Sequence, residues 1–262
     1  MSDRPILFTQ SGSVANVTLN RPLQGNVFDI QMARDLSSAA SRCDTDESIR
    51  CVVLSGTGRM FCAGGDLGLF SSAGGELSSL LSELAGWLHT ALVRFARMQK
   101  PLIVLVNGPA AGAGLSLSLM GDVVIAARSA HFTSAYTGIG LTPDGGLTWI
   151  LPRLVGVRMA QEMILTNRRI DTTEAQRVGL ITRVVDDEVL AEEGGKVAAA
   201  LTQSATRALG ASRSLILESF CSSFETQLER EATAIASAGR HAESAAGIAA
   251  FLTKRPPIFD GA

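Results

Sequence analysis

The chain has 262 residues, with 23 lysines and arginines against 25 aspartates and glutamates, and a formal net charge of −2. This balance excludes the basic surface that is typical of nucleic-acid binding. A composition with 46% hydrophobic and 18% charged residues excludes a disordered chain. The four cysteines form no CxxC pair and have no histidine at metal-ligand spacing. We therefore expect neutral thiols in a reducing compartment and no metal site.

Two features bear on location. The N-terminal residues lack the basic and then apolar arrangement of a signal peptide. Residues 101–121 carry no charge and have about the length of a membrane span. However, Asn107, Gly108, Pro109 and Gly112 interrupt the apolar residues in the middle of this stretch. We interpret it as a buried strand, a turn and the start of a buried helix, and we expect a cytoplasmic protein with no membrane segment.

Strand and helix patterns alternate in the first two-thirds of the chain. Helical patterns lie at residues 30–43 and 77–99. Four short runs rich in valine, isoleucine and leucine do not alternate with polar residues, which predicts strands buried on both faces. These runs are residues 14–19, 49–55, 102–106 and 123–127. Strands that alternate with helices, joined by right-handed crossovers, predict an α/β architecture of stacked βα units.

The composition changes near residue 187. Beyond it the chain is rich in alanine, serine, glutamate and arginine and has helical periodicity. Apolar side chains recur there at spacings that suit one helix face, at Leu215, Ile216, Phe220, Phe224, Leu228 and Ile235. We predict a core at residues 1–186 that carries the functional site, and a helical module at residues 187–262 that packs on the core or on another subunit.

Three glycine-rich segments could carry chemistry. In the first, residues 61–67 (FCAGGDL), Gly64 and Gly65 permit positive φ and leave N–H groups uncovered, which could face an oxygen that gains negative charge. The alternative is a tight turn with Asp66 capping the next helix. The second, residues 107–114 (NGPAAGAG), is a strand-to-helix turn with free N–H groups or a site of close packing. It matches neither GxGxxG nor GxxxxGK(S/T), which argues against a phosphate cradle.

The third segment, residues 138–146 (GIGLTPDGG), places Asp144 after Pro143, where it could begin a turn or cap the following helix. Other catalytic patterns are missing. There is no GxSxG motif. His89 lies on a helical stretch and is interpreted as structural or exposed, while His131 and His241 have no obvious acid or nucleophile nearby, so we expect no catalytic role for any of the three.

Taken together and in this order, the three segments resemble the crotonase (enoyl-CoA hydratase/isomerase) superfamily. The resemblance runs from the LNRP sequence at residues 19–22 to the FLTKR sequence at residues 251–255. It implies a spiral of ββα units followed by helices that build a homotrimer or a dimer of trimers and close the active site. It also implies acyl-CoA thioester substrates, with no cofactor beyond the CoA of the substrate.

The resemblance also implies roles for individual residues. The backbone N–H groups of Gly65 and Ala113 match the two donors that hold the thioester oxygen as it becomes an enolate oxygen. Losing one such donor costs about 10²–10³ in rate. Other positions match segments that contact CoA or the acyl group. They are Leu23, Gln24, Val27, Ala63, Asp66, Leu67, Gly112, Ser116, Tyr136, Pro143 and Lys254.

Departures from the family pattern bear on the reaction. Hydratases of this family carry two catalytic glutamates, and Ser116 and Tyr136 stand at those positions here. Neither is a good base near pH 7, since tyrosine ordinarily titrates near about 10. Asp144 remains, and its position resembles that of the aspartate base of dienoyl-CoA isomerases and of ring-epoxide phenylacetyl-CoA isomerases. One carboxylate is sufficient to remove a proton beside a thioester carbonyl and return it at a remote carbon.

The leading hypothesis is therefore an acyl-CoA isomerase, in fatty-acid metabolism or phenylacetate catabolism, with Asp144 as acid and base. It would either shift a Δ3 double bond to Δ2 or rearrange a ring-epoxide phenylacetyl-CoA. Two alternatives stay open. One is an enoyl-CoA hydratase with an atypical site, and the other is a non-catalytic acyl-CoA-binding or scaffold protein.

Overall fold

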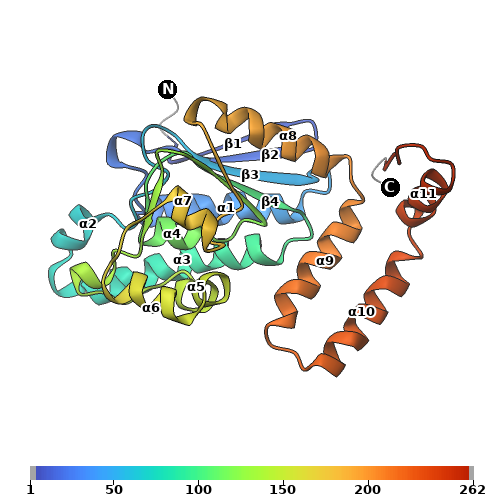
Figure 1. The fold of residues 1–262 in the computed structure, drawn as a ribbon. Helices are drawn as coiled ribbons and strands as arrows, with labels where there is room; N and C mark the ends of the chain where they lie inside the picture. Colours follow the sequence, from blue (N-terminus) through green and yellow to red (C-terminus); the bar gives the residue numbers. More distant parts are fainter. Residues whose placement is uncertain (1–3, 260–262) are drawn as a thin grey trace.

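Two sheets form the centre of the computed structural model, which describes residues 4–259 (Figure 1). The larger sheet has the order β1-β2-β3-β4-β6-β9; β1 and β2 pair antiparallel, and every later pair is parallel. Its strands are β1 (Ile6–Ser11), β2 (Val14–Leu19), β3 (Cys51–Gly56), β4 (Leu102–Val106), β6 (Val123–Ala127) and β9 (Arg183–Val185). The smaller sheet contains β5 (Ala110–Ala111), β7 (His131–Thr133) and β8 (Ile170–Asp171), in that order.

Helices cover both faces of the larger sheet. Figure 1 shows α8 above it and α1 and α3 below it. Alternate residues of the strands point to opposite faces of the sheet. Val53 and Ile103 pack in a cluster with Leu190 of α8, whereas Val52 and Val104 belong to the main core with α1 and α3. This confirms burial on both faces for β3, β4 and β6. For the run at 14–19 the expectation was wrong, because buried and half-buried residues alternate along β2. The helices of this layered part are α1 (Ile30–Thr45), α2 (Leu67–Ser72), α3 (Leu77–Arg97), α4 (Ala113–Ser118), α5 (Leu147–Val155), α6 (Val157–Leu165), α7 (Thr172–Arg177) and α8 (Leu190–Thr202).

The expected elements agree closely with the observed ones. The strands expected at 14–19, 102–106 and 123–127 have those bounds, and the strand expected at 49–55 begins two residues later, at Cys51. The uncharged stretch 101–121 is the predicted strand, turn and buried helix. In the part of the chain that the structure describes, no helix combines the length and apolar character needed to cross a bilayer.

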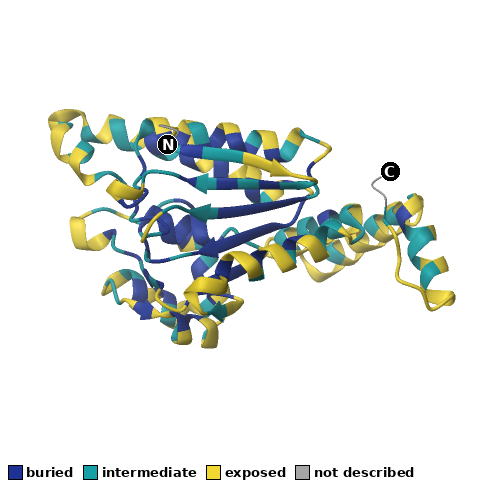
Figure 2. Ribbon diagram, turned by 90° about the horizontal axis from the view of Figure 1, so that it is seen from above, coloured by how far each residue is buried: buried dark blue, intermediate teal, exposed yellow. Residues whose placement is uncertain are grey.

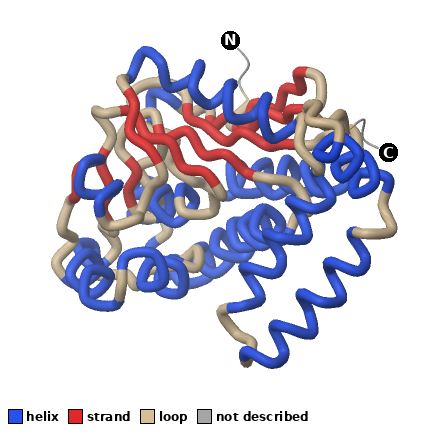
Figure 3. The backbone as a smooth tube through the Cα atoms, turned by 45° about the vertical axis from the view of Figure 1, so that its right-hand side comes forward, coloured by secondary structure: helices blue, strands red, loops and turns tan. Residues whose placement is uncertain are grey.

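The C-terminal region is helical, as predicted, and most of it projects from the layers. The projecting arm consists of α9 (Thr206–Ser219), α10 (Phe224–Ala238) and α11 (Ala242–Leu252). Exposed and intermediate residues dominate the arm in Figure 2, and α10 has no buried residue. The six apolar residues predicted to share one helix face do not do so, because the chain turns between α9 and α10 (Figure 3). Two of them lie in α9, Phe220 follows its end, and three lie in α10. The first helix of residues 187–262, α8, packs on the sheet.

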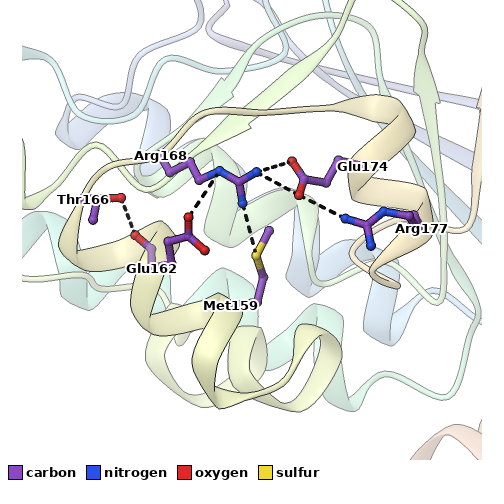
Figure 4. Close-up of polar contacts among 6 residues, drawn as sticks. All are labelled: Met159, Glu162, Thr166, Arg168, Glu174 and Arg177. Atoms are coloured by element: carbon purple, nitrogen blue, oxygen red, sulfur yellow. Dashed lines mark hydrogen bonds and ion pairs between the residues drawn. The ribbon is translucent and has the colours of Figure 1, made fainter.

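A charged cluster joins α6 to α7 (Figure 4). The Arg168 guanidinium donates to both carboxylate oxygens of Glu174, at 2.9 and 2.8 Å, and lies 3.5 Å from a carboxylate oxygen of Glu162. The neighbouring residue, Asn167, accepts a hydrogen bond from Thr133 through its carbonyl oxygen and donates its side-chain amide to Thr137. Asn167 therefore holds Thr137, in the loop that follows Tyr136.

Candidate active site

Two adjacent loops bring the predicted oxyanion donors to one cavity. Gly65 and Ala113 both line a cavity of about 280 Å³. The loops are joined by main-chain hydrogen bonds, from the Cys62 N–H to the Pro109 carbonyl at 3.2 Å and from the Ala111 N–H to the Cys62 carbonyl at 2.9 Å. This pairing fixes the separation of the two donors through the backbone.

The two donor N–H groups are available to a ligand. Within residues 4–259, neither the Gly65 N–H nor the Ala113 N–H donates a hydrogen bond to another protein group. Ala113 is the first residue of α4, where an N–H has no partner inside the helix. Gly64 takes the left-handed conformation that the sequence suggested, with φ +99°, but Gly65 does not. Gly65 is needed for space, because a Cβ there would overlap the Phe70 ring.

Asp144 lies on the wall of the same cavity, in the loop before α5. The Tyr136 hydroxyl donates a hydrogen bond of 2.6 Å to its Oδ1. The Ser116 hydroxyl donates to its main-chain carbonyl oxygen at 3.0 Å. Each hydroxyl has one proton, and each proton is donated to an oxygen atom of Asp144. Oδ2 is left as the oxygen that can accept a proton from a ligand.

The sequence left helix capping open for both Asp66 and Asp144, and the structure shows it for Asp66 alone. Asp66 does cap α2, because its side chain accepts the Leu69 N–H at 3.1 Å, and it lies 3.5 Å from the Arg21 guanidinium. Asp144 does not cap a helix, since α5 begins at Leu147 with Gly146 before it and no side-chain cap. The carboxylate of Asp144 is therefore not needed to start α5.

Tyr136 is a donor in this site. Its side chain is buried. Burial and the neighbouring Asp144 carboxylate raise the pKa of the phenol above its usual value near about 10. Tyr136 therefore keeps its proton at neutral pH and cannot serve there as a base.

Local sequence patterns did not identify two supporting residues. His89 of α3 accepts the Gly145 N–H through Nε2 at 3.0 Å, and Nε2 lies 4.0 Å from Asp144 Oδ2. The interpretation of His89 as structural or exposed agrees with a side chain that is about half exposed, but it did not include these two contacts. Asn26 is fully buried, and its side-chain amide donates to the carbonyls of Thr57, Met60 and Phe61, which holds the turn before Gly65. The only local sequence feature at Asn26 is the glycine before it, which indicates a turn but not these hydrogen bonds.

The structure brings only part of the predicted CoA-contacting set to the cavity. Besides Gly65, Ala113, Tyr136 and Asp144, the cavity lining includes Ala63, Leu67 and Gly112. The turn that carries Leu23 and Gln24 is exposed and lies next to Ala63, whose N–H donates to the Gly25 carbonyl. Val27, Asp66, Ser116 and Pro143 do not line the cavity.

Two predictions placed residues or segments of the C-terminal arm at the site. Lys254 lies on an exposed turn after α11, which Figure 1 shows away from α2 and α3. No residue of 187–259 lines the cavity within this chain. Closure of the site by the C-terminal helices, and a contact from Lys254, would therefore need a neighbouring subunit.

Cysteine and metal chemistry find no support among the described residues. No group of three or more histidine, cysteine, aspartate or glutamate side chains is placed to hold a metal in residues 4–259. Burial raises the pKa of the Cys62 thiol to about 12, so it is a neutral packing group beside the cavity.

Comparison with known proteins agrees with this geometry. Residues 9–262 match the family described as enoyl-CoA hydratase/isomerase. A 1,2-epoxyphenylacetyl-CoA isomerase of Escherichia coli K12 is 39% identical over 95% of each chain, and a probable enoyl-CoA hydratase of Rhodobacter capsulatus is 38% identical over 100% of each. A solved structure described as a putative enoyl-CoA hydratase/isomerase from Mycobacterium abscessus superimposes with a TM-score of 0.93 at 32% identity, covering 98% of this chain and 100% of that one. The chain therefore belongs to the enoyl-CoA hydratase/isomerase family and has the crotonase fold.

Proposed function

We propose that this protein isomerises acyl-CoA thioesters, either by shifting a Δ3 double bond to Δ2 or by rearranging a ring-epoxide phenylacetyl-CoA. One observation carries the proposal. Asp144 is the only carboxylate on the cavity wall within the described residues, and its Oδ2 is free to exchange a proton. A double-bond shift needs one group that takes a proton and gives it back.

For the double-bond shift we propose the following steps. The thioester oxygen accepts hydrogen bonds from the N–H groups of Gly65 and Ala113. Asp144 Oδ2 removes a proton from the carbon between the carbonyl and the double bond, and the electron pair moves to the thioester oxygen to form a dienolate. The same proton then passes from Oδ2 to the far carbon of the old double bond, and the carbonyl re-forms. No atom is gained or lost, so a single carboxylate completes the cycle.

Hydration fits the site less well. Adding water across a conjugated double bond needs one group to activate water and a proton source for the other carbon. Tyr136 is held as a neutral phenol, and the Ser116 proton is engaged by the Asp144 carbonyl. The cavity therefore offers Asp144 alone for two tasks.

The relatives support both the proposal and its alternative. The Escherichia coli relative named for an epoxyphenylacetyl-CoA isomerase favours an aromatic acyl group, and the Rhodobacter relative named as a probable hydratase keeps hydration as the second candidate. The cavity wall favours an apolar acyl group, because Phe28, Phe70, Leu84, Leu88 and Ile139 line it.

The assembly belongs to the same proposal. We infer a homotrimer or dimer of trimers, and the exposed apolar side chains of the arm support it. Phe224, Ile235 and Phe251 are 74%, 75% and 84% exposed in the single chain. Several large apolar side chains exposed on one region of a protein are typical of a protein–protein interface.

The test compares the purified protein with its Asp144→Asn variant on a 3-enoyl-CoA, following the absorbance of the conjugated thioester. Asparagine keeps the shape of the side chain and removes the base, so we expect turnover by the wild type and its loss in the variant. Asp186→Asn is the matched control, since Asp186 is exposed and paired with Arg128 away from the cavity. Equal turnover by wild type and Asp144→Asn would refute the assignment.

Two further measurements separate the alternatives. A hydratase would place oxygen from isotopically labelled water in a 3-hydroxyacyl-CoA product, whereas an isomerase would incorporate none. A non-catalytic protein would bind acyl-CoA without converting either the 3-enoyl or the ring-epoxide substrate. If only the ring-epoxide compound is converted, the aromatic form of the proposal holds.

A further inference from the structure

The peptide group between Asp144 and Gly145 is held at both ends. The Ser116 hydroxyl donates to its carbonyl oxygen at 3.0 Å, and its N–H donates to His89 Nε2 at 3.0 Å. Gly145 has φ +62°, and a Cβ there would lie 2.8 Å from the Cβ of Ser116. The loop therefore depends on these two hydrogen bonds, and on a glycine, for the direction in which the Asp144 carboxylate points.

The hydrogen bond to His89 defines the state of its imidazole. Nε2 accepts the Gly145 N–H, so this nitrogen carries no proton and the neutral ring has its proton on Nδ1. Nε2 also lies 4.0 Å from Asp144 Oδ2. If Nε2 gains a proton, it can no longer accept from Gly145, and its new N–H⁺ stands beside the one carboxylate oxygen that Tyr136 does not engage.

We propose that His89 is a positioning residue for Asp144: its neutral form holds the Asp144–Gly145 peptide and leaves Oδ2 free, and its protonation draws Oδ2 into an ion pair and stops proton transfer. The inference rests on the proposed role of Asp144 as the base. In the protonated state both carboxylate oxygens are engaged, Oδ1 by Tyr136 and Oδ2 by the imidazolium.

The other charged groups around His89 do not offer it a competing partner. His89 is about half exposed, with 48% of its side chain accessible, and it also lines a second, larger cavity of about 750 Å³ between α3, α5 and α9. The charged residues on that cavity are Asp122, Arg153 and Arg213. Asp122 is paired with Arg213 at 2.6 Å, and the Arg153 guanidinium stacks on Trp149 at 4.2 Å. Asp144 is therefore the acid within reach of a His89 imidazolium.

The first test is the pH profile of kcat for isomerisation. Glutamine at position 89 can accept the Gly145 N–H and does not titrate. His89→Gln should keep kcat close to wild type at high pH and lose the acid limb that the imidazole causes. His89→Leu has no acceptor, and its kcat should fall by about 2- to 13-fold at high pH, the range for one neutral hydrogen bond.

The chain's other two histidines provide matched controls. His131→Gln and His241→Gln should both keep the acid limb of the wild type. If His89→Gln retains the same limb, or if glutamine and leucine at position 89 behave alike at every pH, the proposal is wrong. A merely structural role for His89 would change stability or kcat without removing a titration.

A second readout does not depend on turnover. Long-range proton–nitrogen spectra of protein labelled with ¹⁵N-histidine report which ring nitrogen carries the proton, and His89→Gln assigns the signal. We expect the Nδ1–H form in the neutral ring, and an Nε2–H form would overturn the inference. Absence of wild-type turnover on every substrate, with the Nδ1–H form present, would instead refute the proposed function and leave the positioning contact supported.

Discussion

Replacing Tyr136 by phenylalanine removes one hydroxyl from the site and keeps the ring that fills the space. In the wild type this hydroxyl donates to Asp144 Oδ1 at 2.6 Å, within a buried environment. The neighbouring Ser116 hydroxyl cannot replace it, because its proton goes to the Asp144 carbonyl oxygen. In the variant, Oδ1 would have no donor and the carboxylate could rotate, so that Oδ2 would no longer be held toward the substrate.

The size of the effect follows from the kind of bond that is lost. A hydrogen bond to a charged group contributes about 1.5–3 kcal/mol. Since about 1.4 kcal/mol corresponds to a factor of ten in rate, we expect kcat to fall by about 10- to 150-fold. The loss should be smaller than that of Asp144→Asn, which removes the base itself.

Steady-state kinetics on a 3-enoyl-CoA measure this loss, and thermal unfolding of the same preparations shows whether the variant is folded. A folded Tyr136→Phe variant with kcat within about twofold of wild type, less than one neutral hydrogen bond contributes, would refute the reasoning. Tyr136 would then only fill space, and the orientation of Asp144 would have to come from the main-chain contacts of its loop.

Two further predictions test the state of Tyr136 and the oxyanion donors. Tyr136 is the only tyrosine in the chain, and its pKa is raised, so tyrosinate absorbance of the folded protein should appear only well above the value of about 10 seen in denaturant. Above about pH 10 the unfolded chain binds fewer protons than the folded one, so the protein loses stability as the pH rises beyond that value. A tyrosinate midpoint near about 10 in the folded protein would contradict the raised pKa of Tyr136. Ala113→Pro should lower kcat by about 10²–10³-fold, because it deletes one donor N–H at a helix position where proline is tolerated. Thermal unfolding controls for folding of this variant, and turnover near wild type would exclude the Ala113 N–H as a donor.

The sequence was sufficient for the central fold because the strands are short, apolar and buried on both faces. The strands at residues 102–106 and 123–127 are examples, since no other element type fits five apolar residues between turns. The arm was less predictable. Its apolar spacing continues through residues 220–224, but the chain turns there, and apolar periodicity alone does not detect a turn between two helices.

The site, too, was predictable only in part. Gly65, Ala113 and Asp144 lie in glycine-rich segments that local patterns and the family resemblance both identify. His89 lies in the middle of α3, and its contact with Gly145 arises only when that helix packs beside the loop before α5. Ser116 lies 3.2 Å from the Tyr136 hydroxyl and donates to the Asp144 carbonyl, two contacts that the sequence did not predict. Such contacts depend on tertiary packing, which no spacing within the sequence records.

The pairing of the two loops around Cys62 and Ala110 has a consequence for how this protein can vary. Both proposed donors to the thioester oxygen are main-chain groups, and main-chain hydrogen bonds hold the loops together. A substitution outside the tightly packed glycines changes a side chain and keeps these N–H groups, unless it introduces proline, whereas a Cβ at Gly65 or Gly114 would meet the Phe70 ring or the Cys62 carbonyl. The Phe70 ring and the Ala113 methyl group, by contrast, can change the shape of the cavity directly. Single substitutions on the cavity wall can therefore change acyl selectivity while the proposed oxyanion donors keep their main-chain positions.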